Sequence, residues 1–170
     1  GAIGIGLPIF EPVGNMIIDM GGGTVDIALI SLGGIVKSKN LKIAGDKINN
    51  DIISYIRNEF KILIGEKTAE EVKISIGAAI EKKSNEMIVR GRDLVTGLPR
   101  EVVITSADIM EAMGNSILTI IEAAREILET TPPEILSDVM RRGVYMVGGG
   151  ALIKGFDVLL SETLKIPVYV

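Results

Sequence analysis

Three consecutive glycines, Gly21–Gly23, separate two short runs that both have the character of β-strands. The run Asn15–Met20 is apolar and contains β-branched residues, and the run Thr24–Ser31 alternates apolar with polar residues. A second pair of glycines precedes a third run of this kind, Ile35–Ile43. Because glycine allows turns that side chains would hinder, the pattern predicts an antiparallel meander of three strands joined by glycine turns.

The rest of the chain alternates between helical and strand-like segments. Thr68 and Glu71 have the spacing of a capping box, and Ser106 is expected to cap a long helix. Apolar periodicity and these signals predict helices over Gly45–Lys61, Thr68–Ala78, Ser106–Glu129, Pro133–Arg142 and Phe156–Leu164. Further strands are expected over Glu86–Arg92, Arg100–Thr105, Gly143–Val147 and Pro167–Val170.

This order predicts an α/β fold in which helices flank a mixed sheet. The pattern changes at Gly65 and returns to a long helix at Ser106. We therefore expect a core of residues 1–61 and 106–170, with an inserted helix-plus-hairpin subdomain over residues 62–105. With 170 residues, of which 47% are apolar, the chain can bury a core without a disulfide or a structural metal.

Composition excludes several classes of chemistry. The chain contains no Cys and no His, so thiolate catalysis, a Ser-His-Asp triad and His-ligated zinc are ruled out. A net charge of −4 argues against nucleic acid as a partner. The opening Gly1–Phe10 lacks the basic flank of a signal peptide, so a cytoplasmic location is expected. Without a Met start, and with a strand-like end, the chain is expected to be part of a longer protein.

The segment Asp19–Asp26 is the strongest candidate for a binding site. Its glycines let backbone N–H groups approach an anion closely and form a phosphate nest. The Asp19 carboxylate beside such a nest could hold Mg²⁺ through water, since Mg²⁺ takes few carboxylates and keeps several waters. The alternative is a glycine-rich hairpin whose acidic residues face solvent.

Three weaker candidates have equally simple structural explanations. Val147–Leu152 joins a strand to a helix through three glycines. Such a segment either lets a ligand approach the backbone closely or is a plain strand-to-helix turn. Glu70 and Lys73 lie three residues apart and therefore on one face of a helix. They could contact a ligand, or they could form an ion pair exposed to solvent. The polar stretch Arg90–Pro99 is either a surface loop or a protein contact.

These segments resemble the actin superfamily and, within it, the MreB family of bacterial cell-shape proteins. Asp19–Asp26 resembles the second phosphate loop of the superfamily, and Val147–Gly155 resembles its adenosine motif. The matches specific to the MreB family are Ser31–Val36, Ala44–Asp46, Gly65–Glu70 and Arg90–Pro99. The resemblance implies a ribonuclease-H-like, actin-like ATPase fold and covers the C-terminal half, domain II, with a IIA-like core and a IIB-like insert.

The resemblance also implies roles for individual residues. Asp19 would orient a Mg²⁺-bound water, and the role of Asp26 is less defined. The residues that would bind ATP or ADP are Gly21, Gly22, Gly23, Thr24, Asp26, Glu70, Glu71, Val72, Lys73, Gly148, Gly149, Gly150, Ala151 and Leu152. Glu71 has a competing explanation as the capping-box partner.

For the whole protein, the resemblance implies an ATP-hydrolysing cytoskeletal protein whose membrane-associated filaments control rod shape and cell-wall synthesis. Its partners would be further copies of itself and cell-elongation membrane proteins of the RodZ and MreC type. The first phosphate loop, the acid that positions the attacking water and the membrane-binding segment are expected in the other half, so this chain alone should be inactive. Two alternatives stay open, namely a nucleotide-independent interaction module and a metal-dependent nuclease on a ribonuclease-H-like fold that uses Asp19, Asp26 and a third acidic residue.

Overall fold

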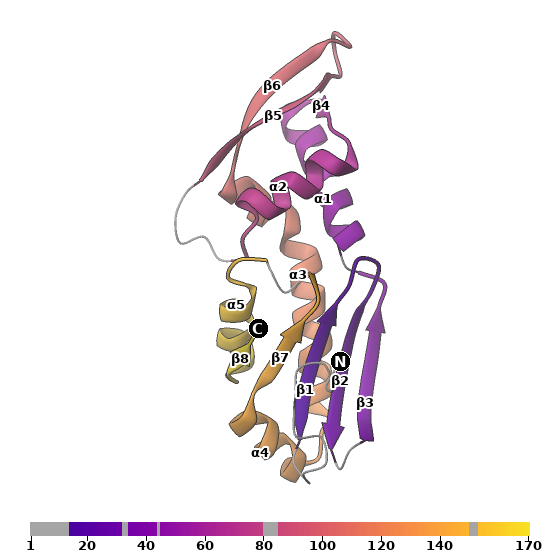
Figure 1. Cartoon of the computed structure of the whole chain (residues 1–170), viewed down its shortest axis with the longest axis vertical. Coiled ribbons are helices and arrows are strands. Elements are labelled where there is room, and N and C mark those ends of the chain that lie inside the picture. Colours follow the sequence, from indigo (N-terminus) through magenta and orange to yellow (C-terminus); the bar gives the residue numbers. More distant parts are fainter. Residues whose placement is uncertain (1–13, 32–33, 44, 80–84, 150–152) are drawn as a thin grey trace.

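Two separate sheets organise the chain, one at each end of an elongated molecule (Figure 1). The computed structural model describes residues 14–31, 34–43, 45–79, 85–149 and 153–170. Its elements, in order, are β1 (Asn15–Met20), β2 (Val25–Ser31), β3 (Gly34–Leu41), α1 (Gly45–Phe60), β4 (Ile62–Leu63), α2 (Glu66–Ile76), β5 (Glu86–Asp93), β6 (Pro99–Thr105), α3 (Ser106–Glu129), α4 (Pro133–Arg142), β7 (Val144–Val147), α5 (Phe156–Leu164) and β8 (Val168–Tyr169).

The larger sheet has the strand order β3-β2-β1-β7-β8. Strands β1, β2 and β3 pair antiparallel, which confirms the predicted meander. Strand β7 pairs parallel with both β1 and β8, so the sheet is mixed. This arrangement brings the carboxyl end of β1 beside the carboxyl end of β7, where the two glycine-rich turns begin.

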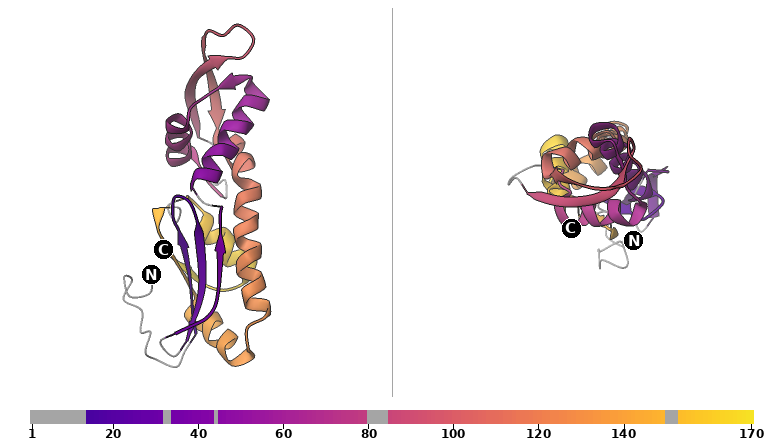
Figure 2. Two further views of the ribbon diagram at one scale, coloured as in Figure 1. Left: turned by 90° about the vertical axis from the view of Figure 1, so that its right-hand side faces the viewer. Right: turned by 90° about the horizontal axis from the view of Figure 1, so that it is seen from above.

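The core lies between this sheet and α3. Directly opposed residues of β1 and β2, such as Ile18 and Ile27, are fully buried on one face of the sheet. Helix α3 contacts β2, β3 and α5, and its residues Ile120 and Ala124 belong to the same apolar core. In Figure 2, α3 runs alongside both halves of the molecule. It contacts β6 and α2 of the upper half as well as the larger sheet. No described helix is long and apolar enough to cross a bilayer.

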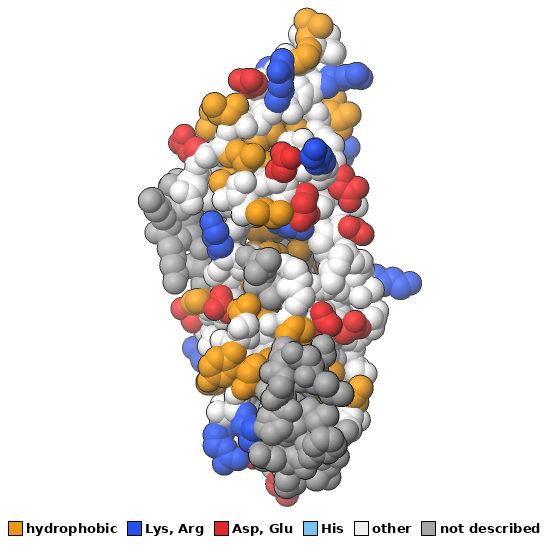
Figure 3. Space-filling model, in the orientation of Figure 1, with side chains coloured by type: hydrophobic (Ala, Val, Ile, Leu, Met, Phe, Trp, Pro, Cys, Tyr) orange, Lys and Arg blue, Asp and Glu red, His pale blue; other side chains and the backbone are white. Residues whose placement is uncertain are grey.

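The smaller sheet, β4-β5-β6, forms the upper half together with α1 and α2. Strands β5 and β6 lie in a different sheet from β1–β3, while the residue boundaries expected for the inserted subdomain stay a prediction. The short strand β4 was not expected from the sequence. Apolar side chains are visible at the upper tip in Figure 3, where Leu94, Val95 and Leu98 are exposed.

Both predicted helix caps were wrong. Helix α2 begins at Glu66 after Gly65, without a side-chain cap, and Ala69 N–H already donates to Gly65 O at 3.0 Å, so Thr68 lies inside the first turn. The cap of α3 is Thr105, which forms the capping box with Asp108. Ser106 is already the first helical residue, one position past the cap, and its Oγ accepts a hydrogen bond from Asn85 N–H at 3.0 Å instead.

Candidate functional site

The turn between β1 and β2 is braced by the first residues of α1. Gly21 N–H donates to Thr24 O at 2.9 Å and closes the turn. Gly45 N–H donates to Gly21 O at 3.4 Å, and Asp46 N–H donates to Gly22 O at 2.9 Å. Helix α1 therefore uses two of its unpaired N-terminal donors to hold the turn.

This bracing sets the direction of the N–H groups in the turn. In a trans peptide the N–H points opposite to the preceding C=O, and the described chain has no cis peptide. Since the Gly21 and Gly22 carbonyls point at α1, the N–H groups of Gly22 and Gly23 point away from it. Successive N–H groups on one side of a turn form an anion nest.

Glycine is not required here by the folded chain itself. None of Gly21–Gly23 adopts a positive φ, and a Cβ built on Gly22 or Gly23 would meet nothing within 4 Å. Open space remains where side chains would otherwise stand. A group placed against these N–H groups, such as a phosphate, fits that space, and a Cβ would narrow it.

The two acidic residues that flank the turn lie side by side on one face of the sheet. Asp19 is directly opposite Asp26 on β2 and opposite Val147 on β7. Asp26 is exposed and accepts a hydrogen bond from the Asn40 side chain, whereas Asp19 is half-buried. Gly148 comes so close that an added Cβ would lie 2.8 Å from Asp19 Oδ1. The described residues include no group of three or more acidic residues able to hold a metal ion.

Glu70 and Lys73 form an ion pair on α2, with Lys73 Nζ 2.8 Å from Glu70 Oε2. Only 12% of the Lys73 side chain is exposed, whereas 44% of the Glu70 side chain is exposed, so the pair is partly shielded from solvent on its Lys73 side. Asn49 of α1 donates to the same oxygen at 2.7 Å. The hydrogen bonds from Lys73 and then Asn49 lower the pKa of Glu70 and outweigh the opposing effect of burial.

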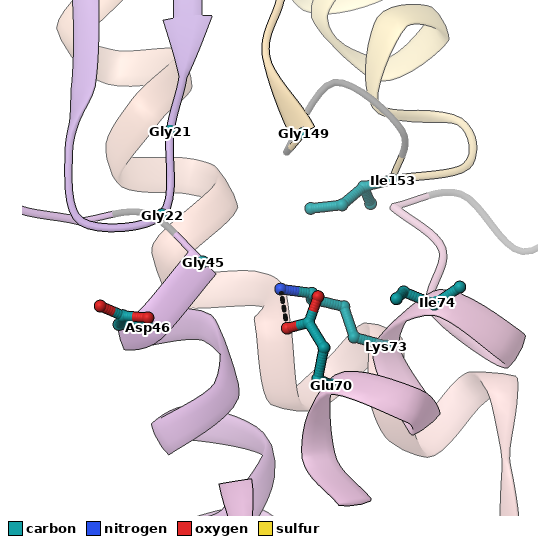
Figure 4. Close-up of a pocket in the computed structure, with 9 residues that line it drawn as sticks. All are labelled: Gly21, Gly22, Gly45, Asp46, Glu70, Lys73, Ile74, Gly149 and Ile153. Carbon is teal, nitrogen blue, oxygen red and sulfur yellow. Dashed lines mark ion pairs between the residues drawn. The ribbon is translucent and has the colours of Figure 1, made fainter. Parts of the chain in front are cut away.

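A pocket of about 340 Å³ brings these pieces together (Figure 4). Its walls are Gly21, Gly22, Gly45, Asp46, Glu70, Lys73, Ile74, Gly149 and Ile153. The Lys73 and Glu70 head groups lie between the α1 start and the two isoleucines, while the Asp46 carboxylate points away from them. The volume is at the lower end of the range for small-molecule sites.

Five of the residues implied by the resemblance line this pocket, namely Gly21, Gly22, Glu70, Lys73 and Gly149. Gly23, Thr24, Asp19, Asp26 and Gly148 lie at or next to the glycine turns but outside the lining. Val72 is fully buried in the core, and Glu71 is exposed on α2, so neither lines the pocket. Gly150, Ala151 and Leu152 lie outside the described residues.

Sequence reasoning missed four lining residues: Gly45, Asp46, Ile74 and Ile153. Gly45 and Asp46 belonged to a segment noted only for its family resemblance. Ile74 was detectable in principle, since it follows Lys73 on α2 and leaves an apolar side chain largely exposed beside a charged pair. Ile153 reaches the pocket only through tertiary packing.

Comparison with known proteins gives the family. A model of the family described as "MreB/Mbl protein" matches residues 1–170. The chain belongs to the MreB/Mbl family. Cell shape-determining protein Mbl of Bacillus subtilis (strain 168) is 50% identical over 170 residues, which are 99% of this chain and 51% of that protein. This MreB/Mbl chain thus spans about half the length of the curated relatives it matches.

Solved structures agree with the MreB/Mbl assignment and show an actin-like fold. MreB5 of Spiroplasma citri bound to AMPPNP is 44% identical with a TM-score of 0.95, over 98% of this chain and 50% of that one. The same protein has been solved bound to ADP. The MamK double helical filament, at 22% identity and a TM-score of 0.76, covers 92% of this chain and 49% of the MamK chain, and it supports the fold alone.

Proposed function

We propose that this chain binds ATP or ADP in the pocket between its two halves, as part of a longer actin-like protein whose filaments determine cell shape. The observation that carries the proposal is the convergence of the α1-braced glycine turn and the Glu70–Lys73 pair on one pocket. The similarity to MreB5 bound to AMPPNP supports it.

Each wall of the pocket suits a different part of a nucleotide. The N–H groups of Gly22 and Gly23 would bind phosphate oxygens. Lys73 and Glu70 would form hydrogen bonds with the sugar or base, and Ile74 and Ile153 would contact the base through apolar surface. One end of the pocket thus suits anionic groups and the other suits an aromatic ring, as in an amphipathic ligand.

The half-buried Asp19 carboxylate beside the turn fits a Mg²⁺ ion held through water, because Mg²⁺ needs only one or two carboxylates when phosphate supplies further oxygens. Bound Mg²⁺ would neutralise part of the phosphate charge. Asp26 already accepts a hydrogen bond from Asn40 and lies on β2, one strand further from β7 than Asp19, so we assign the metal-orienting role to Asp19 alone.

The functions of the whole protein are part of the same proposal. ATP hydrolysis, filament growth, location at the cytoplasmic membrane and partners of the RodZ and MreC type would need the other half as well. Catalysis there would come from positioning and charge stabilisation of a phosphoryl group. The alternative of a nucleotide-independent interaction module predicts no response to nucleotide.

The test is thermal unfolding of this chain with and without Mg-ATP or Mg-ADP. Because this chain carries only one of the two expected phosphate loops, we expect Kd values on the order of 1 mM. Ligand at tenfold Kd should then raise the free energy of unfolding by about 1.4 kcal/mol and the melting temperature by about 3–6 °C. Asp19→Ala should remove the Mg²⁺-dependent part of the shift. Asp138→Ala, which removes an acidic residue on the distant α4, is the matched control and should behave as the unsubstituted chain. An equal Mg²⁺-dependent shift in both variants would contradict the metal assignment.

A further inference from the structure

Asn49 is a buried amide beside the pocket that the proposed function leaves without a role. It lies on α1, and only 4% of it is exposed. Its Nδ2 donates to Glu70 Oε2, the same oxygen that accepts from Lys73 Nζ. Asn49 is not among the residues that line the pocket, so it reaches the pocket only through Glu70.

Helix α1 makes contact with both functional walls. At its first turn, Gly45 and Asp46 hold the carbonyl groups of the glycine turn. One turn later, Asn49 holds the carboxylate of Glu70 on α2. Lys73 Nζ also lies close to the α1 start, 3.5 Å from where a Gly45 Cβ would be. The phosphate side and the α2 side of the pocket are therefore fixed to one rigid element.

The two ends of the Asn49 amide have opposite effects on stability. Its Nδ2 donates to the Glu70 carboxylate and favours the charged form of that group. Its Oδ1 is buried and has no hydrogen-bond partner among the described residues. A buried acceptor without a partner is destabilising, whereas an apolar residue of similar size at such a site is close to neutral or favourable. A side chain kept only for packing α1 against α2 would be better as leucine.

We propose that Asn49 is a positioning residue that orients the Glu70–Lys73 pair toward the nucleotide without touching the nucleotide itself. The inference rests on the proposed function. The amide is suited to this task because its NH₂ group donates a hydrogen bond to a carboxylate and carries no charge. Without it, Glu70 has only the Lys73 side chain to fix its rotamer.

Asn49→Leu in the full 170-residue chain separates this role from a structural one. We expect the Kd for Mg-ADP, measured by isothermal titration calorimetry, to rise about tenfold, as for loss of one hydrogen bond to a charged group. The melting temperature without nucleotide should change little, because the lost hydrogen bond to Glu70 and the removal of the unpartnered Oδ1 have opposite effects on stability. Asn50→Leu, the same substitution at the exposed neighbouring residue, should leave the Kd unchanged. Asn49→Ala serves if the leucine variant does not fold.

A double-mutant cycle supplies the second readout. Because Asn49 acts through Glu70, Asn49→Leu should have no further effect on Kd in a Glu70→Ala background. Fully additive effects, or an unchanged Kd in Asn49→Leu, would overturn the inference and leave the proposed function standing. Absence of Mg-ADP binding by the unsubstituted chain would overturn the proposed function and this inference with it.

Discussion

Gly148 lies close to the end of β1, so a substitution there tests the close approach of the two glycine-rich turns. Its φ is +88°, and an added Cβ would lie 2.5 Å from Met20 O and 2.8 Å from Asp19 Oδ1. An unfavourable φ costs about 1–3 kcal/mol, and forcing an atom into a packed site adds about as much. We expect Gly148→Ala to lower the free energy of unfolding by about 3 kcal/mol, or the melting temperature by about 6–12 °C.

The assay is urea unfolding followed by circular dichroism. Gly149→Ala is the matched control, because the adjacent glycine has no positive φ and a Cβ there would meet nothing within 4 Å. Its free energy of unfolding should change by less than about 0.5 kcal/mol. If the two variants were equally stable, the close approach of β7 to β1 at Asp19 would be refuted.

Three further predictions concern the α2 pair and the caps. Glu70→Ala and Lys73→Ala should each weaken Mg-ADP binding in calorimetry and lower the free energy of unfolding by about 1–2 kcal/mol, because the Lys73 side chain is largely buried. Unchanged affinity for Mg-ADP in both variants would leave the pair with a structural role alone. Thr105→Ala should lower the free energy of unfolding by about 1 kcal/mol in urea, and Thr68→Ala should not, because only Thr105 caps a helix. The hydrogen bonds that Glu70 accepts lower its pKa from the ordinary value of 4.5. The ionised Glu70 side chain therefore stabilises the fold fully above pH 4.5, and this stabilisation is lost as the pH falls through the folded-state pKa. The difference in unfolding free energy between the chain and Glu70→Gln should therefore narrow on acidification, and a pH-independent difference would contradict this.

The fold was largely predictable because its signals are local. The apolar run of β1, the alternation in β2 and the apolar spacing in α1 gave bounds within a few residues of those observed. The parallel pairing of β7 with β1 was not predictable, since it joins segments more than 100 residues apart and no local pattern encodes it. Strand β4 was missed because two residues, Ile62 and Leu63, show no periodicity.

The helix caps show where local signals mislead. Thr68 has the right spacing to Glu71, yet the helix continues upstream to Glu66. Thr105 and Ser106 are both good capping residues, and the structure places the cap at Thr105, with Asp108 as its capping-box partner, and Ser106 in the helix. Several neighbouring residues can therefore match the sequence pattern of a helix cap, and the pattern alone does not say at which of them the helix begins.

The candidate site was predictable in its parts and less so in its assembly. The i,i+3 spacing placed Glu70 and Lys73 on one face of α2, and their ion pair has that geometry. The contribution of Asn49 depends on how α1 packs against α2, which the sequence does not state. The apolar Val72 was carried over with its neighbours, although helical geometry turns it toward the core.

The central claim, that a nucleotide occupies this pocket, is tested most directly by two-dimensional ¹H–¹⁵N NMR of the chain titrated with Mg-ADP to several times Kd. We predict that the amide signals of Gly22, Gly23, Lys73 and Gly149 shift together with one saturation curve, while those of the distant hairpin tip around Val95 stay fixed. Unchanged signals at the glycine turn and α2, or shifts confined to other surfaces, would contradict the account.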